Sequence, residues 1–335
     1  MLRWRGLEAT PGDLGRTVVT IGMYDGVHRG HQELIGAAVA RARAMRRPSL
    51  LLTFDPHPAE VVRPGSHPAI LTSMDRKAEL VAELGVDAMC VLPFTPEFMR
   101  LSPETFTHTV LVEHLHAAQV VIGQNFTYGH RAAGTVDTLV AEGRRFGFSV
   151  EGVPLANVGS RRGGGEGEAV DSGEEDVTIS STYIRACVAA GDMDSAARAL
   201  GRAHRVDGVV VRGDRRGRDL GYPTANVECP PFTAIPADGV YAGHLVTRDP
   251  RSGASRERFP AAISVGTNPT FQGSRRTVEA FVLDYDGDLY GEHVGVEFVE
   301  RLRPMAAFPD VAALVTAMDK DVVDTRRILG MPGAS

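Results

Sequence analysis

Residues of the types that bind phosphate are concentrated near the N-terminus, in the segment Gly22–His31, which reads GMYDGVHRGH. Its glycines let the backbone turn and approach a ligand closely. An apolar, β-branched run at 18–21 predicts a buried parallel strand before it, and apolar spacing over 31–46 predicts a helix after it. His28 and His31 would then share one side of a helix N-terminus, where N–H groups favour an anion. The segment predicts a phosphate site.

Two other interpretations of His28 and His31 remain open from these residues. The histidines can act as helix-capping or core residues, or they can form part of a zinc site. A zinc site takes three or four ligands, and the sequence shows no CxxC or HExxH partner. Phosphate binding is therefore favoured over both alternatives.

A second polar group lies in the middle of the chain. Ser180, Ser181 and Thr182 offer three hydroxyls, and Arg185 adds a guanidinium within two helical turns. These groups suit a triphosphate. The alternative is that the hydroxyls only cap the helix predicted over 187–200, because Ser and Thr are common at helix starts.

Two features of the C-terminal half suit a metal–nucleotide complex and an alcohol substrate. In the segment GYPTAN, the Thr224 hydroxyl and the Asn226 carboxamide are oxygen donors for a hard cation or its waters. A surface turn is the alternative. Glu279 lies on an otherwise apolar strand, TVEAFVLDY, which makes it a candidate base. A satisfied carboxylate at a barrel mouth, or an outward-facing one, is the alternative there.

The elements that must position these residues differ between the two halves. Strand and helix patterns alternate through the first half, which predicts a doubly wound parallel sheet. The loops that carry His28, Asp55 and Asn125 follow strands, so they should meet at the carboxyl ends. The second half has short β-branched runs separated by turns, followed by a helical pattern at Val311–Leu329. It predicts an antiparallel barrel with a C-terminal helix.

Composition narrows the classes of protein further. The chain has 335 residues and a net charge of −6, so it predicts about two domains and offers no broad basic surface for nucleic acid. Its three cysteines are far apart, and no run approaches a membrane helix or a signal core. We therefore expect a cytoplasmic protein. The Gly- and acid-rich stretch 159–176 predicts a mobile loop.

Taken together, these motifs resemble a known family. GxxDGxHxGH is similar to the HxGH signature of nucleotidyltransferases, and ISSTYIR is similar to their second phosphate-binding signature. The resemblance becomes specific with further matches along the chain: TFDPHP, VIGxNFxYG, LGYPTAN, DGVYAG, SVGTNPTF and the TVE strand. Over about residues 16–330 the chain resembles the prokaryotic bifunctional riboflavin kinases/FAD synthetases, which are also FMN adenylyltransferases.

The resemblance implies two enzymes in one chain. It implies a Rossmann-like α/β FMN adenylyltransferase domain at 1–186, a linker helix at 187–203 and a β-barrel riboflavin kinase domain at 204–335. ATP would be the co-substrate, Mg²⁺ the cofactor, and no tightly bound prosthetic group is expected beyond substrate and product flavins. The implied partners are riboflavin, FMN, FAD, ATP, ADP and pyrophosphate, with no nucleic acid and no membrane. The sequence gives no oligomeric state.

The resemblance also implies roles for individual residues. In the kinase, Glu279 would be the base, and Thr224 and Asn226 would bind Mg²⁺ and nucleotide, with Gly213, Gly221 and Pro223 shaping that site. In the adenylyltransferase, His28 and His31 would stabilise charge on the α-phosphate of ATP without acting as bases. The other expected ATP-binding residues there are Gly22, Asp25, Gly26, Ser180, Ser181, Thr182 and Arg185, and the expected flavin-binding residues are Asn125 and Phe126.

Two rival functions and two departures from the family accompany this interpretation. The rivals are an adenylyltransferase for another phosphorylated vitamin and a flavin-binding regulator without activity. The GYPTAN segment and Glu279 argue against the first, and the intact motifs argue against the second. Tyr24 stands where phenylalanine is usual, and Phe281 stands where histidine is frequent.

Overall fold

The computed structural model describes residues 1–65, 67–154, 178–213, 220–249, 255–270 and 273–331. Stretch 159–176, predicted above to be a loop, lies outside them. The chain divides into two compact units. One comprises Met1–Pro68 and Arg76–Ser180, and the other comprises Ala69–Asp75 and Ser181–Ser335.

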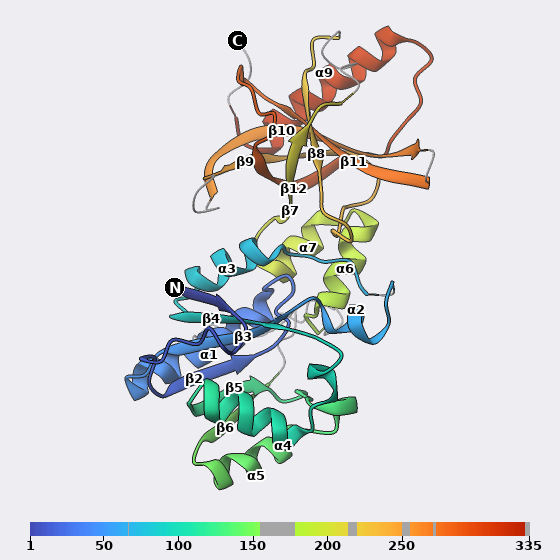
Figure 1. The fold of residues 1–335 in the computed structure, drawn as a ribbon. Helices are drawn as coiled ribbons and strands as arrows, with labels where there is room; N and C mark the ends of the chain where they lie inside the picture. Colours follow the sequence, from blue (N-terminus) through green and yellow to red (C-terminus); the bar gives the residue numbers. More distant parts are fainter. Residues whose placement is uncertain (66, 155–177, 214–219, 250–254, 271–272, 332–335) are drawn as a thin grey trace, which may run out of the picture. The chain divides into compact units, whose positions relative to one another are not determined.

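The first unit is built on a six-stranded sheet in which all neighbouring strands are parallel (Figure 1). The strands, in their order across the sheet, are β1 (Leu2–Arg5), β4 (Ala88–Pro93), β3 (Ser49–Asp55), β2 (Thr17–Ile21), β5 (Ala117–Gly123) and β6 (Ser149–Val153). The strand order reverses between β2 and β5, and ligands bind beyond the carboxyl ends of parallel strands at such a point. The predicted doubly wound sheet is confirmed.

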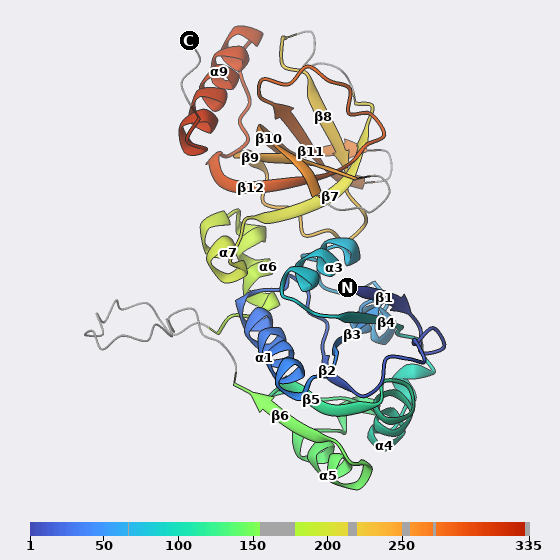
Figure 2. The ribbon, with the colours of Figure 1, turned by 90° about the vertical axis from the view of Figure 1, so that its left-hand side faces the viewer.

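Helices cover both faces of this sheet, as Figure 2 shows for α1 and α5. On one face, Ala38 and Ala42 of α1 pack on Val18 and Val121. The opposite face carries the larger apolar core, which includes Leu111 and residues from the helices that follow β4 and β5. The helical segments of this part of the chain are α1 (Arg29–Met45), α2 (Pro58–Val62), α3 (Met74–Glu83), η1 (Phe98–Arg100), α4 (Pro103–Phe106), the π-helix η2 (Thr107–His114), η3 (His130–Ala132) and α5 (Val136–Phe146).

The second unit contains a closed antiparallel barrel. Around the barrel the strands are β10 (Ser255–Thr270), β11 (Gly273–Val282), β8 (Thr224–Glu228), β7 (His204–Val211), β12 (His293–Arg303) and β9 (Gly239–Arg248). Helices α6 (Ser181–Ala190) and α7 (Met193–Leu200) precede it, and α9 (Val311–Ile328) packs against β9, β10 and β12 (Figures 1 and 2). The predicted barrel and terminal helix are confirmed.

The structure differs from the sequence prediction in several elements. The predicted helix 187–200 is two helices, because the chain breaks at Gly191 and Asp192 caps the second by accepting a hydrogen bond from Ser195 N. Strands β1 and β8 were not predicted, since each is short and β8 begins inside the Gly- and Pro-containing GYPTAN segment.

Within the described residues, no helix is long and apolar enough to cross a membrane.

Candidate functional sites

The loop between β2 and α1 has a strained backbone. Tyr24 and Val27 have φ of 50° and 40°, in the left-handed region that residues with a Cβ seldom occupy, and Gly26 has φ of 84°. Strain of this kind persists only where the surrounding structure enforces it, and it is concentrated at functional sites. Asp25, Gly26 and Val27 are all buried. The loop is therefore a fixed part of the domain.

His28 is the N-cap of α1. Its Nδ1 accepts a hydrogen bond from the backbone N–H of His31 at 3.3 Å, so the capping interpretation describes its geometry. An accepting Nδ1 carries no proton, which places the proton of the neutral ring on Nε2. The rings of His28 and His31 stack with their centroids 3.6 Å apart. The two predicted phosphate ligands are thus brought together.

His31 is uncharged in this site. Burial lowers the pKa of His31 well below its ordinary value, and the neighbouring His28 and Lys77 lower it further. Its Nδ1 is buried without a hydrogen-bond partner among the described residues. A buried polar atom left this way has a free-energy cost. That cost is relieved when a ligand supplies a partner.

The zinc alternative finds no support around these histidines. The part of the chain that the structure describes contains no group of three or more His, Cys, Asp or Glu side chains that could hold a metal ion.

Neighbouring loops place other predicted residues at the same sheet edge. Asp55 ends β3, and Asn125 and Phe126 follow β5, on either side of β2. Asp55 pairs with Arg5 at 2.5 Å, and His57 caps α2 by accepting from Ala59 N at 3.1 Å. These contacts shape the loop. Asn125 is exposed.

An aromatic cluster, which the sequence reasoning identified only in part, lies beside this edge. Phe126 stacks on Tyr128 with ring centroids 5.6 Å apart, and a chain of ring contacts continues through Phe106 and Phe98 to Phe54 at the end of β3. Phe94 contacts both Phe54 and Phe98. The signal for it is the repeated phenylalanine spacing after β4, in PFTPEFM.

The ISSTYIR residues fall at the boundary between the two units. Ser180 is the last residue assigned to the first unit, whereas Ser181, Thr182 and Arg185 lie in α6 of the second. Arg185 Nε donates to Ala69 O at 2.6 Å. The expectation that these side chains hold the same phosphates as the histidines stays a prediction.

The predicted kinase residues come together on two paired strands of the barrel. Glu279 of β11 lies opposite Asn226 of β8, and Phe281 lies opposite Thr224, so the four side chains share one face. Thr224 Oγ1 donates to Glu279 Oε2 at 3.3 Å. A Cβ on Gly213 would lie 2.4 Å from the Asn226 side chain. Because Gly213 has no side chain, the Asn226 side chain can occupy this space.

Two cavities meet at Thr224. One, of about 400 Å³, is largely apolar, and Thr224 and Glu279 line it together with Phe281, Met305, Phe308 and Met318. The other, of about 530 Å³, is more polar and is lined by Thr224, Arg212, Tyr285, Asp286 and Asp288 among others. Gly221 and Pro223 lie just before β8, Gly221 with φ of 85°. The two cavities, which differ in polarity, thus share Thr224 in their linings.

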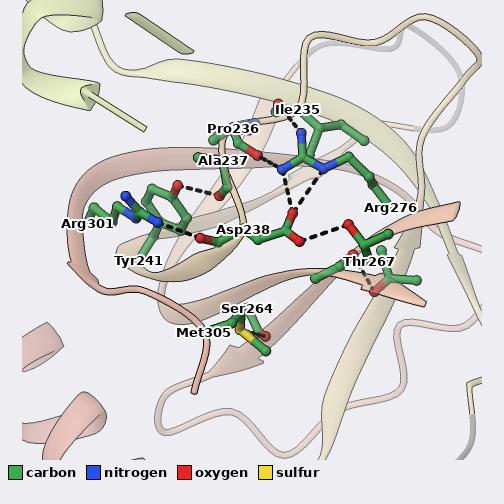
Figure 3. Close-up of polar contacts among 12 residues, drawn as sticks. Ile235, Pro236, Ala237, Asp238, Tyr241, Ser264, Thr267, Arg276, Arg301 and Met305 are labelled. Atoms are coloured by element: carbon green, nitrogen blue, oxygen red, sulfur yellow. Dashed lines mark hydrogen bonds and ion pairs between the residues drawn. The ribbon is translucent and has the colours of Figure 1, made fainter. Parts of the chain in front are cut away.

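An ion-pair network that the sequence reasoning missed holds one end of the barrel (Figure 3). The carboxylate of Asp238 accepts from Arg276 Nη2 at 2.7 Å and from Thr267 Oγ1 at 2.8 Å, and Arg301 Nη2 donates to its backbone oxygen at 2.6 Å. These contacts tie β10, β11 and β12 to the start of β9. Asp238 is the first residue of the DGVYAG segment, and this motif is the sequence signal that could have indicated it.

Fold and sites together define an enzyme class: a parallel α/β domain with a strained loop and paired histidines after β2, joined to a β-barrel whose carboxylate faces an apolar cavity. Family models match both halves, FAD synthetase at residues 10–163 and riboflavin kinase at residues 200–329. The bifunctional riboflavin kinase/FMN adenylyltransferase of Listeria monocytogenes is 34% identical over 92% of this chain and 91% of its own. That of Pseudomonas fluorescens is 34% identical over 98% of both. The chain belongs to this bifunctional riboflavin kinase/FMN adenylyltransferase family.

A solved structure shares the whole architecture. The crystal structure of a protein named as a macrolide-efflux protein, from Streptococcus pneumoniae, covers 97% of this chain and 99% of its own with a TM-score of 0.82 and 29% identity. Its name differs from those of the bifunctional relatives, which are the basis of the family assignment above.

Proposed function

We propose that the barrel domain phosphorylates riboflavin and that the α/β domain adenylylates the resulting FMN, with ATP as co-substrate of both steps and the cytoplasm as their location. The domains would span 204–335 and 1–186, joined by 187–203. Membership in the family supports both activities. The observation that carries the assignment of residues is Thr224, which borders an apolar and a polar cavity and donates to Glu279.

In the kinase reaction, the riboflavin 5′-hydroxyl attacks the γ-phosphorus of ATP. The new O–P bond forms as the bond to the β–γ bridging oxygen breaks, which yields FMN and ADP. Glu279 accepts the hydroxyl proton, because an alcohol is a weak nucleophile and a base adds driving force. The apolar cavity suits the flavin ring, and the more polar one suits the nucleotide. Thr224 would lie where the phosphoryl group crosses.

The residues present fit Mg²⁺ as the cofactor of this step. Thr224 and Asn226 supply neutral oxygen donors on one face beside the Glu279 carboxylate. Mg²⁺ is commonly held by few protein ligands together with substrate phosphates. When bound, it would neutralise the charge that develops on the transferred phosphoryl group. We assign Thr224 and Asn226 to it.

Adenylyl transfer needs charge stabilisation more than proton transfer. The FMN phosphate is largely dianionic at neutral pH, since its second pKa is about 6. It attacks the α-phosphorus of ATP and expels pyrophosphate without a general base. His28 carries its proton on Nε2 and can donate it to the α-phosphate, and we assign the same role to the unpartnered Nδ1 of His31. Gly22, Asp25 and Gly26 shape the cradle, and Ser180, Ser181, Thr182 and Arg185 complete the phosphate grip.

The flavin of FMN would bind at the aromatic cluster. Phe126 is half-buried and stacks on the buried Tyr128, so its ring would offer an apolar surface beside the carboxyl ends of the strands. Asn125 is exposed next to it and can hydrogen-bond a polar ring edge. This position would bring the FMN phosphate towards the loop that bears His28.

A single incubation tests the assignment. The full chain with riboflavin, ATP and Mg²⁺ should form FMN and FAD, resolved by chromatography. Glu279→Gln should reduce FMN formation at least 100-fold while FAD formation from added FMN stays within 2-fold. Glu300→Gln, an exposed carboxylate on β12, is the matched control and should leave both rates unchanged.

Each other outcome has a defined meaning. Loss of both activities in Glu279→Gln would contradict separate sites. Absence of FMN and FAD with the unaltered chain would refute both activities and favour a flavin-binding regulator. Adenylylation of another phosphorylated vitamin in place of FMN would favour the alternative acceptor.

A further inference from the structure

The lysine at position 77 is buried directly behind the phosphate-binding loop. It lies on α3, its side chain is almost inaccessible at 4% exposure, and its Nζ donates to Met23 O at 2.7 Å. Met23 belongs to the strained loop that follows β2. A lysine on an amphipathic helix is ordinarily exposed, and a buried ammonium has a large desolvation cost. Its location therefore requires an explanation.

The groups around Lys77 differ in charge. Asp25 and Asp55 favour its charged form, although burial lowers the pKa of Lys77 below its ordinary value. Asp55 already pairs with Arg5 at 2.5 Å. His31 beside the loop is uncharged, as derived above. The ammonium of Lys77 is thus a positive charge already in place at the loop before nucleotide arrives.

We infer that Lys77 is a further residue of the adenylyltransferase site, whose ammonium charge stabilises the ATP triphosphate from behind the loop beside His28 and His31. This inference rests on the proposed function of the N-terminal domain. A fixed charge in a dry site stabilises a multiply charged ligand without reorganisation, which is the form of electrostatic stabilisation that phosphate transfer uses.

The alternative is that Lys77 only anchors the loop through the Met23 carbonyl. The chain offers a matched control, because Thr53 Oγ1 donates to the same oxygen at 3.2 Å from a fully buried position on β3. Thr53→Val removes a hydrogen bond to Met23 O and leaves the charge unchanged. Lys77→Met removes both, Lys77→Gln keeps a donor without the charge, and Lys77→Arg keeps both.

The experiment measures FAD formation from FMN and inhibition by pyrophosphate in the full chain, with riboflavin phosphorylation as the internal control. We expect Lys77→Met and Lys77→Gln to raise KM for ATP at least 10-fold and to weaken pyrophosphate inhibition by a similar factor. Lys77→Arg should stay within about 5-fold and Thr53→Val within about 2-fold of the unaltered chain. Kinase rates should not change in any variant.

Three outcomes would overturn the inference. One is an unchanged KM for ATP in Lys77→Gln, and another is a loss in Thr53→Val equal to that in Lys77→Met, which would leave the carbonyl contact as the cause. The third is a fall in kcat alone with unaltered pyrophosphate inhibition. If Lys77→Met does not fold, Lys77→Gln against Lys77→Arg decides. A failure of the proposed function is distinct, because the unaltered chain would then make no FAD.

Discussion

At the scale of single residues, Tyr24, where the resemblance implies a phenylalanine, has a structural role. Its hydroxyl lies 2.6 Å from Thr20 Oγ1, both side chains are buried, and its ring contacts the edge of His31 at 5.2 Å. Burial raises the pKa of the Tyr24 hydroxyl above its normal range. Tyr24 is therefore uncharged, and its hydroxyl stabilises the loop rather than the reaction.

Tyr24→Phe should therefore separate stability from activity. It leaves the Thr20 hydroxyl buried without its partner, so the free energy of unfolding should fall by about 1–2 kcal/mol. FAD formation should remain within 2-fold, because the ring keeps its place against His31. Urea denaturation and the FMN adenylylation assay measure the two effects. The double variant Tyr24→Phe with Thr20→Val should recover most of the stability, and failure to recover would contradict this account.

At the scale of elements, closure of the barrel depends on the close approach of β9 and β12. Gly243 of β9 pairs with Phe298 of β12, and a Cβ at this glycine would lie 1.9 Å from the backbone oxygen of Glu297. A backbone atom cannot move aside as a flexible side chain does. The strand pair therefore requires a residue without a side chain.

Gly243→Ala should destabilise the barrel by at least ~2 kcal/mol, because the strands must separate to admit the methyl group. Kinase activity should be lost at a lower temperature, which preincubation followed by the FMN assay measures. Gly266→Ala on β10 is the control, since the nearest atom to its Cβ would be 3.8 Å away. Equal effects of the two changes would show that glycine flexibility, rather than this contact, matters.

The elements also show how far the sequence was informative. Strong strand–helix alternation predicted the parallel sheet, and the HxGH spacing predicted the paired histidines. Strand β8 could not be predicted, because only its pairing with β7 and β11 makes an extended segment of five residues stable. The burial of Lys77 could not be predicted for a similar reason, because it depends on the loop that folds over this side chain. The network around Asp238 could not be predicted either, because its partners lie on strands that are distant in the sequence.

At the scale of the whole molecule, the two units do not correspond to two continuous halves of the chain. Segment 69–75 belongs to the second unit: Ile70 N donates to Phe232 O at 2.7 Å, and Ser73 Oγ donates to the half-buried Asp207 carboxylate at 2.6 Å. No motif marks this segment. A titration experiment should therefore follow each unit with a probe of its own.

Acid should destabilise both units, each through a half-buried histidine. Burial is the main cause that lowers the pKa of His244 on β9 to about 4, with Arg258 adding to the shift and Glu297 opposing it. The unfolded chain binds this proton near pH 6.5, so between pH 6.5 and about 4 the unfolded state holds more protons. The barrel should thus lose stability as the pH falls through that window, by at most about 3 kcal/mol.

His244→Asn should flatten this pH dependence in the barrel alone. Urea denaturation between pH 7.5 and 4.5 measures it, with surviving kinase activity as the barrel probe and the fluorescence of Trp4, the chain's single tryptophan, as the probe of the first unit. The Trp4 transition should keep its own acid sensitivity, because His31 there has a lowered pKa of the same sign. His293→Asn, exposed on β12, is the control. If His244→Asn shifts both transitions equally, the units do not titrate independently.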